Sequence, residues 1–363
     1  MTPLRTTAAS ILYALVMALL FLVGCEEPFD LATLPQPEQN VIDTAYVQIY
    51  PPYGGYDGAE DIQVGNDQLL YVAHTRANRL VMLNRAGQVL SERTILHPRS
   101  VSQDMRLDLL VGGEIVTSNG DTAGAVFRIS LVSADPALAH RLDRAPIDTL
   151  WSEVARPSRR FPGIAAFGDN SYLVVRNGPD NSSFIDPDGR VMLFSPVDAF
   201  ITPLPFNTGV GTSISNIYVP TGISAFPGVK DFVLVQSSEG VAYGGIWMFY
   251  EKSADVDGWV PKFDPARSDD RAVDFIRPNQ YDSPEAVAID RSRRDVFIAD
   301  AGLDSVFKYN SRGAFKSESF GFARTGGAML RPTGLAYSDK VLYVLDGAQG
   351  QILRFRLSTD VPR

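Results

Sequence analysis

From about residue 45 onward, short runs of β-branched and aromatic residues alternate with turn-forming residues. One clear unit has apolar runs at 285–289, 295–300 and 305–309, and it closes on the turn 310–313, Asn-Ser-Arg-Gly. The third run alternates apolar and polar residues, as expected for a strand with one buried face. Runs of this length bounded by Gly, Asn, Asp and Pro predict β-strands rather than helices.

The three-run unit recurs along the chain. A first copy spans 61–83 and a last copy spans 332–355, with looser copies between them. The first runs of the six units are anchored near Asp61, Ser100, Gly163, Gly222, Ala286 and Gly334. Their spacing of about 40 to 65 residues is typical of propeller blades with loops of variable length. The chain also holds 30 Gly and 24 Pro, which supply the turns that many short strands need.

The two ends of the repeat region complement each other. The last unit stops after its third run, near Leu357, and an unassigned alternating segment at 45–50 precedes the first unit. If that segment supplies the missing fourth strand, the ring closes and no blade keeps an open edge. We therefore predict an all-β fold, a six-bladed β-propeller over 43–360 that an N-terminal strand closes.

The segment 326–336 carries a Gly-rich turn followed by Pro332-Thr333-Gly334-Leu335-Ala336. It resembles the inter-blade signature of NHL repeats, in which such a turn leads to Pro-x-Gly-Ile-Ala at the start of the next innermost strand. The resemblance is good in the two C-terminal units, fair in the first and faint in the middle three. It implies a six-bladed β-propeller.

The N-terminus has the pattern of an export signal. Arg5 precedes an uncharged apolar run at 8–23, which is shorter than the roughly 20 residues of a membrane-spanning helix. The run ends in Leu22-Val23-Gly24-Cys25, which resembles the lipobox of bacterial lipoproteins. The resemblance implies that Cys25 is diacylated and becomes the new N-terminus. It makes 1–24 a lipoprotein signal peptide and 25–42 a flexible tether.

Cys25 is the single cysteine of the chain, so no intramolecular disulfide and no Cys-based zinc site is expected. Several acyl chains on one residue give stable anchoring, which predicts a membrane partner through the lipid and a place in the cell envelope. Glu26 and Glu27 follow directly. Acidic residues there resemble the surface-export signals of Bacteroidetes-like lineages, which favours the outer membrane or cell surface over the inner membrane.

Charge and motifs exclude several functions. A net charge of -9 argues against nucleic-acid binding through phosphate neutralisation. The sequence has no Gly-x-Ser-x-Gly elbow and no His-Glu-x-x-His helix, so no catalytic residue is assigned. Two Asp-x-Asp-Gly stretches, 186–189 and 255–258, lack the closing Glu of a calcium loop. We interpret both as turns, the first at the hairpin position that 310–313 occupies in its own unit.

The best candidates for a site are the residues that alignment places just before each innermost strand, because these positions surround the mouth of a propeller channel. They are Glu60, Arg99, Pro162, Thr221, Glu285 and Thr333. The charged members, Glu60, Arg99 and Glu285, form a candidate ligand or metal site.

A second set follows the second strand of a blade, where NHL repeats commonly carry Asp. Asp300 and Asp346 hold this position, and we expect them to accept hydrogen bonds from backbone N–H groups and fix a turn. His74 takes the same position in the first unit. These three are candidate rim residues.

Two main functional hypotheses follow. The first is a lipid-anchored, non-enzymatic binding or scaffold module without a cofactor, which takes a protein, peptide or glycan on the aromatic-bearing loops at 131–160, 195–219 and 251–282. The alternative is a metal-dependent hydrolase or lyase, similar to lactonases of the gluconolactonase and paraoxonase type. It would hold a divalent cation such as calcium near Glu60 and Glu285. A third reading is a subunit of an envelope complex.

The lipid anchor can be tested directly. Cys25→Ser removes the thiol that would carry the acyl chains, so the protein should move from the membrane fraction to the soluble fraction on cell fractionation. Membrane retention of this variant would refute lipidation at Cys25.

Overall fold

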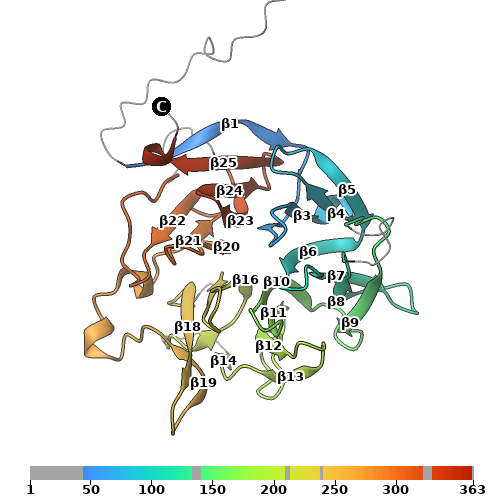
Figure 1. The fold of residues 1–363 in the computed structure, drawn as a ribbon. Coiled ribbons are helices and arrows are strands. Elements are labelled where there is room, and N and C mark those ends of the chain that lie inside the picture. The colour runs from blue at the N-terminus through green and yellow to red at the C-terminus, as the bar shows by residue number, and fades with distance from the viewer. Residues whose placement is uncertain (1–43, 133–139, 209–212, 238–239, 322–328, 362–363) are drawn as a thin grey trace, which may run out of the picture. The chain divides into compact units, whose positions relative to one another are not determined.

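The computed structural model describes residues 44–132, 140–208, 213–237, 240–321 and 329–361. The predicted signal peptide, Cys25 and the tether lie outside these residues. Strands make up 49% of the structure and helices 4%. Six sheets stand around one axis as the blades of a β-propeller (Figure 1), which confirms the predicted fold. In the described part of the chain, no helix is both long and apolar enough to cross a bilayer.

The first four blades are antiparallel sheets of four consecutive strands each. The first consists of β2 (Asp61–Val64), β3 (Leu70–His74), β4 (Arg79–Leu83) and β5 (Val89–Thr94). The second consists of β6 (Leu96–Gln103), β7 (Leu109–Val116), β8 (Thr122–Ile129) and β9 (Ile147–Ser152). The third consists of β10 (Arg160–Ala166), β11 (Tyr172–Asn177), β12 (Arg190–Phe194) and β13 (Phe200–Pro203). The fourth consists of β16 (Pro220–Ala225), β17 (Phe232–Gln236), β18 (Gly245–Lys252) and β19 (Asp257–Pro261).

The remaining two blades differ from this pattern. The fifth has β20 (Pro284–Ile289), β21 (Val296–Asp300) and β22 (Ser305–Tyr309), and single bridges from β22 to Phe315 and Phe320 stand in for an outer strand. The sixth joins β23 (Pro332–Ser338), β24 (Val341–Asp346) and β25 (Gln351–Leu357) to β1 (Tyr46–Gly54). Outside the blades, β14 (Asn207–Thr208) and β15 (Asn216–Ile217) form a short parallel pair. Within the described ranges, the 3₁₀ turns are η2 (Thr75–Ala77), η3 (Ser268–Asp270), η4 (Asp274–Ile276) and η5 (Ser358–Asp360).

The ring closes as the sequence predicted. β1 pairs antiparallel with β25, with Tyr46 opposite Leu357 and Gln48 opposite Phe355. The N–H of Ser358 extends the pairing by donating to the Ala45 carbonyl at 2.8 Å. The sixth blade therefore takes its outer strand from the start of the propeller and its other three strands from the end.

The small residues that anchored the repeat lie where adjacent innermost strands come closest. A Cβ atom on Gly222 would lie 2.6 Å from the Glu285 carbonyl oxygen of the next blade. A Cβ atom on Gly334 would lie 3.1 Å from the Ile62 nitrogen. A side chain would therefore clash with the neighbouring backbone at Gly222 and would fit only tightly at Gly334. Asp61 occupies the equivalent position in the first blade.

The apolar core is divided among the interfaces between neighbouring blades. One cluster, for example, joins Phe297 and Val306 of the fifth blade to Leu335, Val344 and other residues of the sixth. Tyr46 of β1 belongs to this cluster and is 9% exposed. Its ring lies 5.9 Å from that of Phe297 and 5.3 Å from that of Phe320, so β1 contributes to the core as well as to the sheet.

Replacing Tyr46 tests how much the closing strand stabilises the ring. Tyr46→Ala leaves a cavity against Phe297 and Phe320 and should lower the free energy of unfolding by about 3 kcal/mol. Tyr46→Phe keeps the ring and should cost less than about 1 kcal/mol. Urea unfolding measures both. Equal stability of Tyr46→Ala and wild type would contradict this role of β1.

Candidate functional site

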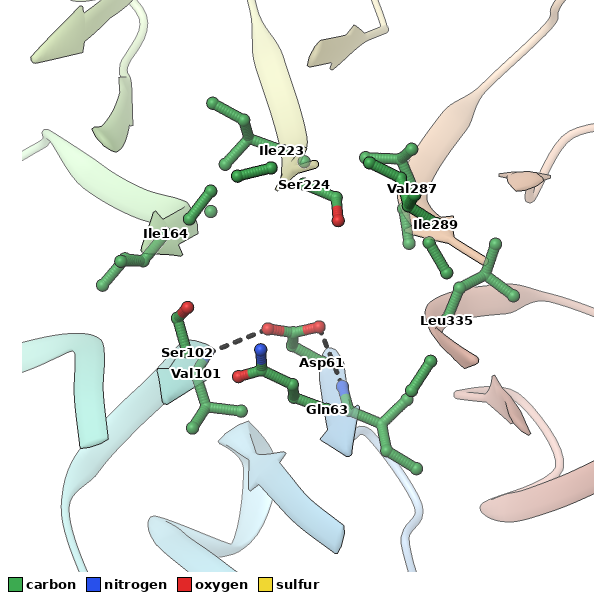
Figure 2. A pocket seen from close by; sticks show the side chains of 18 of the residues that line it. Asp61, Gln63, Val101, Ser102, Ile164, Ile223, Ser224, Val287, Ile289 and Leu335 are labelled. Carbon is green, nitrogen blue, oxygen red and sulfur yellow. Dashed lines mark hydrogen bonds between the residues drawn. The ribbon is translucent and has the colours of Figure 1, made fainter. Parts of the chain in front are cut away.

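A cavity of about 540 Å³ follows the axis of the ring. The innermost strands of all six blades line it, namely β2, β6, β10, β16, β20 and β23. Figure 2 shows side chains from these strands around the opening. Its volume falls in the range of sites for small organic molecules, roughly 300–1,000 Å³. It is therefore the best candidate site in the described structure.

All six predicted mouth residues line this cavity, at the end where the innermost strands begin. Their position differs in one respect from the prediction. Glu60 precedes its strand, but the other five lie inside theirs, where the register with the second strand shifts. A residue at such a bulge has no partner opposite it, so the bulge can turn its side chain toward the axis.

The structure brings Glu60, Arg99 and Glu285 to one mouth. Nη1 of Arg99 donates to both carboxylate oxygens of Glu60, at 3.0 and 2.8 Å. Glu285 accepts a hydrogen bond from Ser283 Oγ at 3.3 Å. Arg331, which the sequence analysis did not single out, lines the same mouth. The mouth thus holds two carboxylates and two guanidinium groups.

Burial dominates the titration of both carboxylates at the mouth. It raises the pKa of Glu60, although Arg99 opposes the shift. It raises the pKa of Glu285 as well, and there Arg331 gives the strongest opposition. Each carboxylate is therefore compensated by a nearby guanidinium group.

The three candidate rim residues are buried and do not line the cavity. The carboxylate of Asp300 accepts four backbone N–H bonds, and that of Asp346 accepts three. Both therefore fix turns, which is the role expected from the sequence. His74 holds the same place in the first blade, but its Nε2 lies 2.9 Å from the Asp57 carbonyl oxygen and can donate to it. The first blade thus has a hydrogen-bond donor, His74, at the position where the fifth and sixth blades have the acceptors Asp300 and Asp346.

Asp61 is the most unusual group on the cavity wall. Its Oδ1 accepts the Ile62 N–H at 2.8 Å, and its Oδ2 accepts the Val101 N–H of the next blade at 2.9 Å. Burial raises the pKa of Asp61 to about 7, and the charge on Glu60 adds to the shift, whereas the two N–H bonds oppose it. Near neutral pH this carboxyl group can therefore either donate or accept a proton.

The wall around Asp61 is divided into a polar and an apolar part. Figure 2 shows Gln63 and Ser102 with Asp61 on one side of the opening, from the first two blades. The remaining blades contribute mainly apolar side chains, including Ile164, Ile223, Val287, Ile289 and Leu335. Gln63 Oε1 accepts the Gln103 N–H at 2.8 Å, which leaves the Gln63 amide nitrogen available to a ligand.

The described residues offer the calcium ion of the lactonase-like hypothesis no cluster of acidic or histidine ligands. Among the described residues, no three His, Cys, Asp or Glu side chains lie close enough to hold a metal ion. At the mouth, Arg99 already occupies both oxygens of Glu60. We therefore derive no step through a metal.

The two Asp-x-Asp-Gly stretches differ in their structure. The stretch at 255–258 lies at the β18–β19 hairpin, as expected. The expectation for 186–189 is wrong, because this stretch precedes β12 instead of following it. There Asp186 and Asp188 pair with the buried Arg159 at 2.7 Å each, and Asp186 also pairs with Arg176. These carboxylates hold a loop in place by ion pairing.

Sequence reasoning missed Asp61 as a site residue although a signal was present. The other five blades have Ser, Gly or Ala at this position, where neighbouring innermost strands come close. An acidic residue at the same position in the first blade is therefore an exception to the pattern. Arg331 had no comparable signal, because it lies one residue before its strand and outside the aligned positions.

No protein-family model and no curated protein matches the chain. Solved structures with the same fold do. A luciferin-regenerating enzyme is 11% identical, with a TM-score of 0.56 over 87% of this chain and 95% of its own. A PQQ-bound aldose sugar dehydrogenase from Streptomyces coelicolor is 12% identical, with a TM-score of 0.54 over 87% and 99%. A gluconolactonase from Xanthomonas campestris is 11% identical, with a TM-score of 0.52 over 87% and 90%. At these identities the likeness is one of fold.

The titration of Asp61 can be measured by ¹³C NMR of its side-chain carboxyl, and the expected pKa is about 7. The folded protein then binds this proton more tightly than the unfolded chain, so the group makes unfolding easier as the pH rises from 3.8 to about 7. Asp61→Asn lacks this contribution, and its stability relative to wild type should rise over that interval. A carboxyl titrating near 4 would contradict the assignment.

Proposed function

We propose that this protein is a hydrolase or lyase for small organic molecules, with its site in the axial cavity and Asp61 as the general acid–base group. The observation that carries the proposal is the position of the Asp61 carboxyl group on the cavity wall, where burial raises its pKa. A catalytic acid or base works best when its pKa lies near the working pH. Strongly perturbed carboxyl groups inside a pocket are typical of functional sites.

The proposed chemistry uses side chains already in place. For an ester or lactone, the Asp61 carboxylate would remove a proton from a water molecule as its oxygen attacks the carbonyl carbon. The carbon–oxygen bond to the leaving group then breaks, and Asp61 returns the proton to the departing oxygen. The free amide nitrogen of Gln63 is two residues along β2, on the same face as Asp61, and would donate to the carbonyl oxygen as it gains charge.

The comparisons support this enzymatic hypothesis more than the non-enzymatic scaffold that the sequence analysis placed first. The similar propellers include a gluconolactonase and a sugar dehydrogenase. The divalent cation of the original lactonase-like hypothesis is not part of the proposal, because among the described residues no three His, Cys, Asp or Glu side chains form a group that could hold a metal ion.

We also propose the cellular setting that the N-terminal sequence predicts. The propeller would be held in the cell envelope by acyl chains on Cys25, at the outer membrane or cell surface, with the segment 25–42 as its tether. We further propose that the blades are NHL-like repeats, as the resemblance of the C-terminal blades implies.

Asp61→Asn tests the role of the carboxyl. Wild-type protein is assayed for proton release with a panel of γ- and δ-lactones, and the variant is assayed with the lactone turned over fastest. Loss of a general base should lower kcat about 100- to 10,000-fold. The wild-type pH profile should show an inflection near the pKa of Asp61, and any residual activity of the variant should lack it.

The control is Asp339→Asn, which removes an exposed carboxylate paired with Arg85, away from the cavity. This variant should keep wild-type activity. Dialysis against EDTA should also leave the wild-type rate unchanged. Full activity in Asp61→Asn would refute the proposed role of Asp61, and a rate that EDTA abolishes and calcium restores would favour a metal-dependent mechanism.

A further inference from the structure

The end of the cavity opposite the mouth carries one charged side chain among the described residues. This end is lined by Tyr337 near the end of β23 and by five residues that follow the other innermost strands: Asn66, Met105, Phe167, Phe226 and Arg291. Of these only Arg291 is charged. It lies two residues after β20, whereas Glu285 lies near the beginning of the same strand. The two ends of the cavity thus differ in charge as well as in position.

Arg291 reaches toward another part of the ring. Its Nη1 donates to Asn66 Oδ1 at 2.7 Å, so a side chain of the fifth blade meets one of the first. Asn66 is itself held by its Nδ2, which donates to the Asp104 carbonyl at 3.0 Å. The guanidinium group is therefore positioned by a neutral amide that is fixed on its other side. A guanidinium group has five N–H donors, so most of them are left for a ligand.

No carboxylate of the described residues compensates Arg291. At the mouth, Arg99 pairs with Glu60, and Arg331 acts on both Glu60 and Glu285. The described structure gives Arg291 no salt bridge, and the residue is exposed. Its remaining N–H donors are therefore open to a molecule in this end of the cavity, and a bound carboxylate would accept charge-assisted hydrogen bonds from them.

We propose that Arg291 binds the carboxylate of the substrate, so that the cavity takes an amphipathic carboxylic acid with its acid group at the far end. This rests on the proposed function, because it places the reacting group of the same molecule beside Asp61. The apolar side chains between them, among them Ile223, Val287 and Ile289, contact the body of the molecule.

Strand geometry sets the length of such a molecule. Asp61 begins β2 and Val64 ends it, which at about 3.3 Å per residue separates the two levels by about 10 Å. A carboxylate at Arg291, beyond the ends of the strands, thus lies at least that far along the axis from a group at Asp61. A short acid such as acetate cannot reach both, whereas an acid with an apolar chain or ring of this length can.

The probes for a test are 5-phenylpentanoate and its neutral match 5-phenylpentanamide, whose binding to the whole protein is measured by isothermal titration calorimetry. Wild-type protein should bind the carboxylate at least about 10-fold more tightly than the amide, because charge-assisted hydrogen bonds are the stronger ones. In Arg291→Gln this preference should fall to within about 2-fold. Arg291→Lys, which keeps the charge, should restore part of it.

Arg331→Gln is the matched control, because it removes a guanidinium group from the other end of the same cavity. It should keep the preference for the carboxylate. A preference lost in Arg331→Gln but kept in Arg291→Gln would place the anion at the mouth and overturn the proposal. Absence of any preference in wild-type protein would overturn it too. The thermal unfolding midpoint of each variant verifies that it is folded.

The failure of this proposal can be told apart from failure of the proposed function. Asp61→Asn should keep the preference for the carboxylate even though it loses activity. If Asp61→Asn is fully active but the preference still depends on Arg291, only the acid–base role of Asp61 fails. If Asp61→Asn is inactive and Arg291→Gln keeps the preference, only the carboxylate site fails.

Discussion

Neighbouring innermost strands approach each other so closely that a side chain at the crossing point has almost no room. The distance of 2.6 Å between a Cβ atom on Gly222 and the next blade's carbonyl oxygen shows how little space is left. The same strands enclose the axial cavity of about 540 Å³. The close approach also explains why Gly, Ala and Ser recur at this position. The apolar clusters between blades depend on the same spacing, because each is formed from the facing sides of two adjacent sheets.

The electrostatic character of the cavity follows from the single exception to that rule. Asp61 places a carboxyl where five blades have a small residue, and the wall contributed by most other blades is apolar. In such surroundings the ionised form loses hydration that two backbone N–H groups only partly replace. Glu60, one residue away, has Arg99 as a partner and is compensated. The two adjacent acidic residues therefore differ. Glu60 is paired with a guanidinium group, whereas Asp61 can exchange a proton near neutral pH. Neighbouring carboxyl groups that differ in this way are common in acid–base sites.

The fold was largely predictable from the sequence, and the site was predictable only in part. Six repeats and an unpaired strand at 45–50 suffice for a closed propeller, because strand pattern and turn residues are local properties. The mouth residues Glu60, Arg99 and Glu285 could be found by counting from the repeats. The roles of Asp61 and Arg291 could not, since they depend on what lies across the axis. Asn66 and Arg291 are 225 residues apart in sequence, and only ring closure brings them into contact. The buried pairing of Asp188 with Arg159 likewise depends on a loop whose place among the strands the repeats did not reveal.

The pairing of β1 with β25 also has a consequence for biosynthesis. Tyr46 lies opposite Leu357, so the first strand to leave the ribosome must wait for nearly the last before it finds its partner. Five blades can form while the chain is being made, but the sixth cannot. During that time β1 has an unpaired edge and an exposed aromatic ring, which is the condition in which strands pair with wrong partners. A chain exported before folding would complete its ring only on the far side of the membrane. Folding factors of that compartment, rather than those of the cytoplasm, would then have to protect β1 until the ring closes.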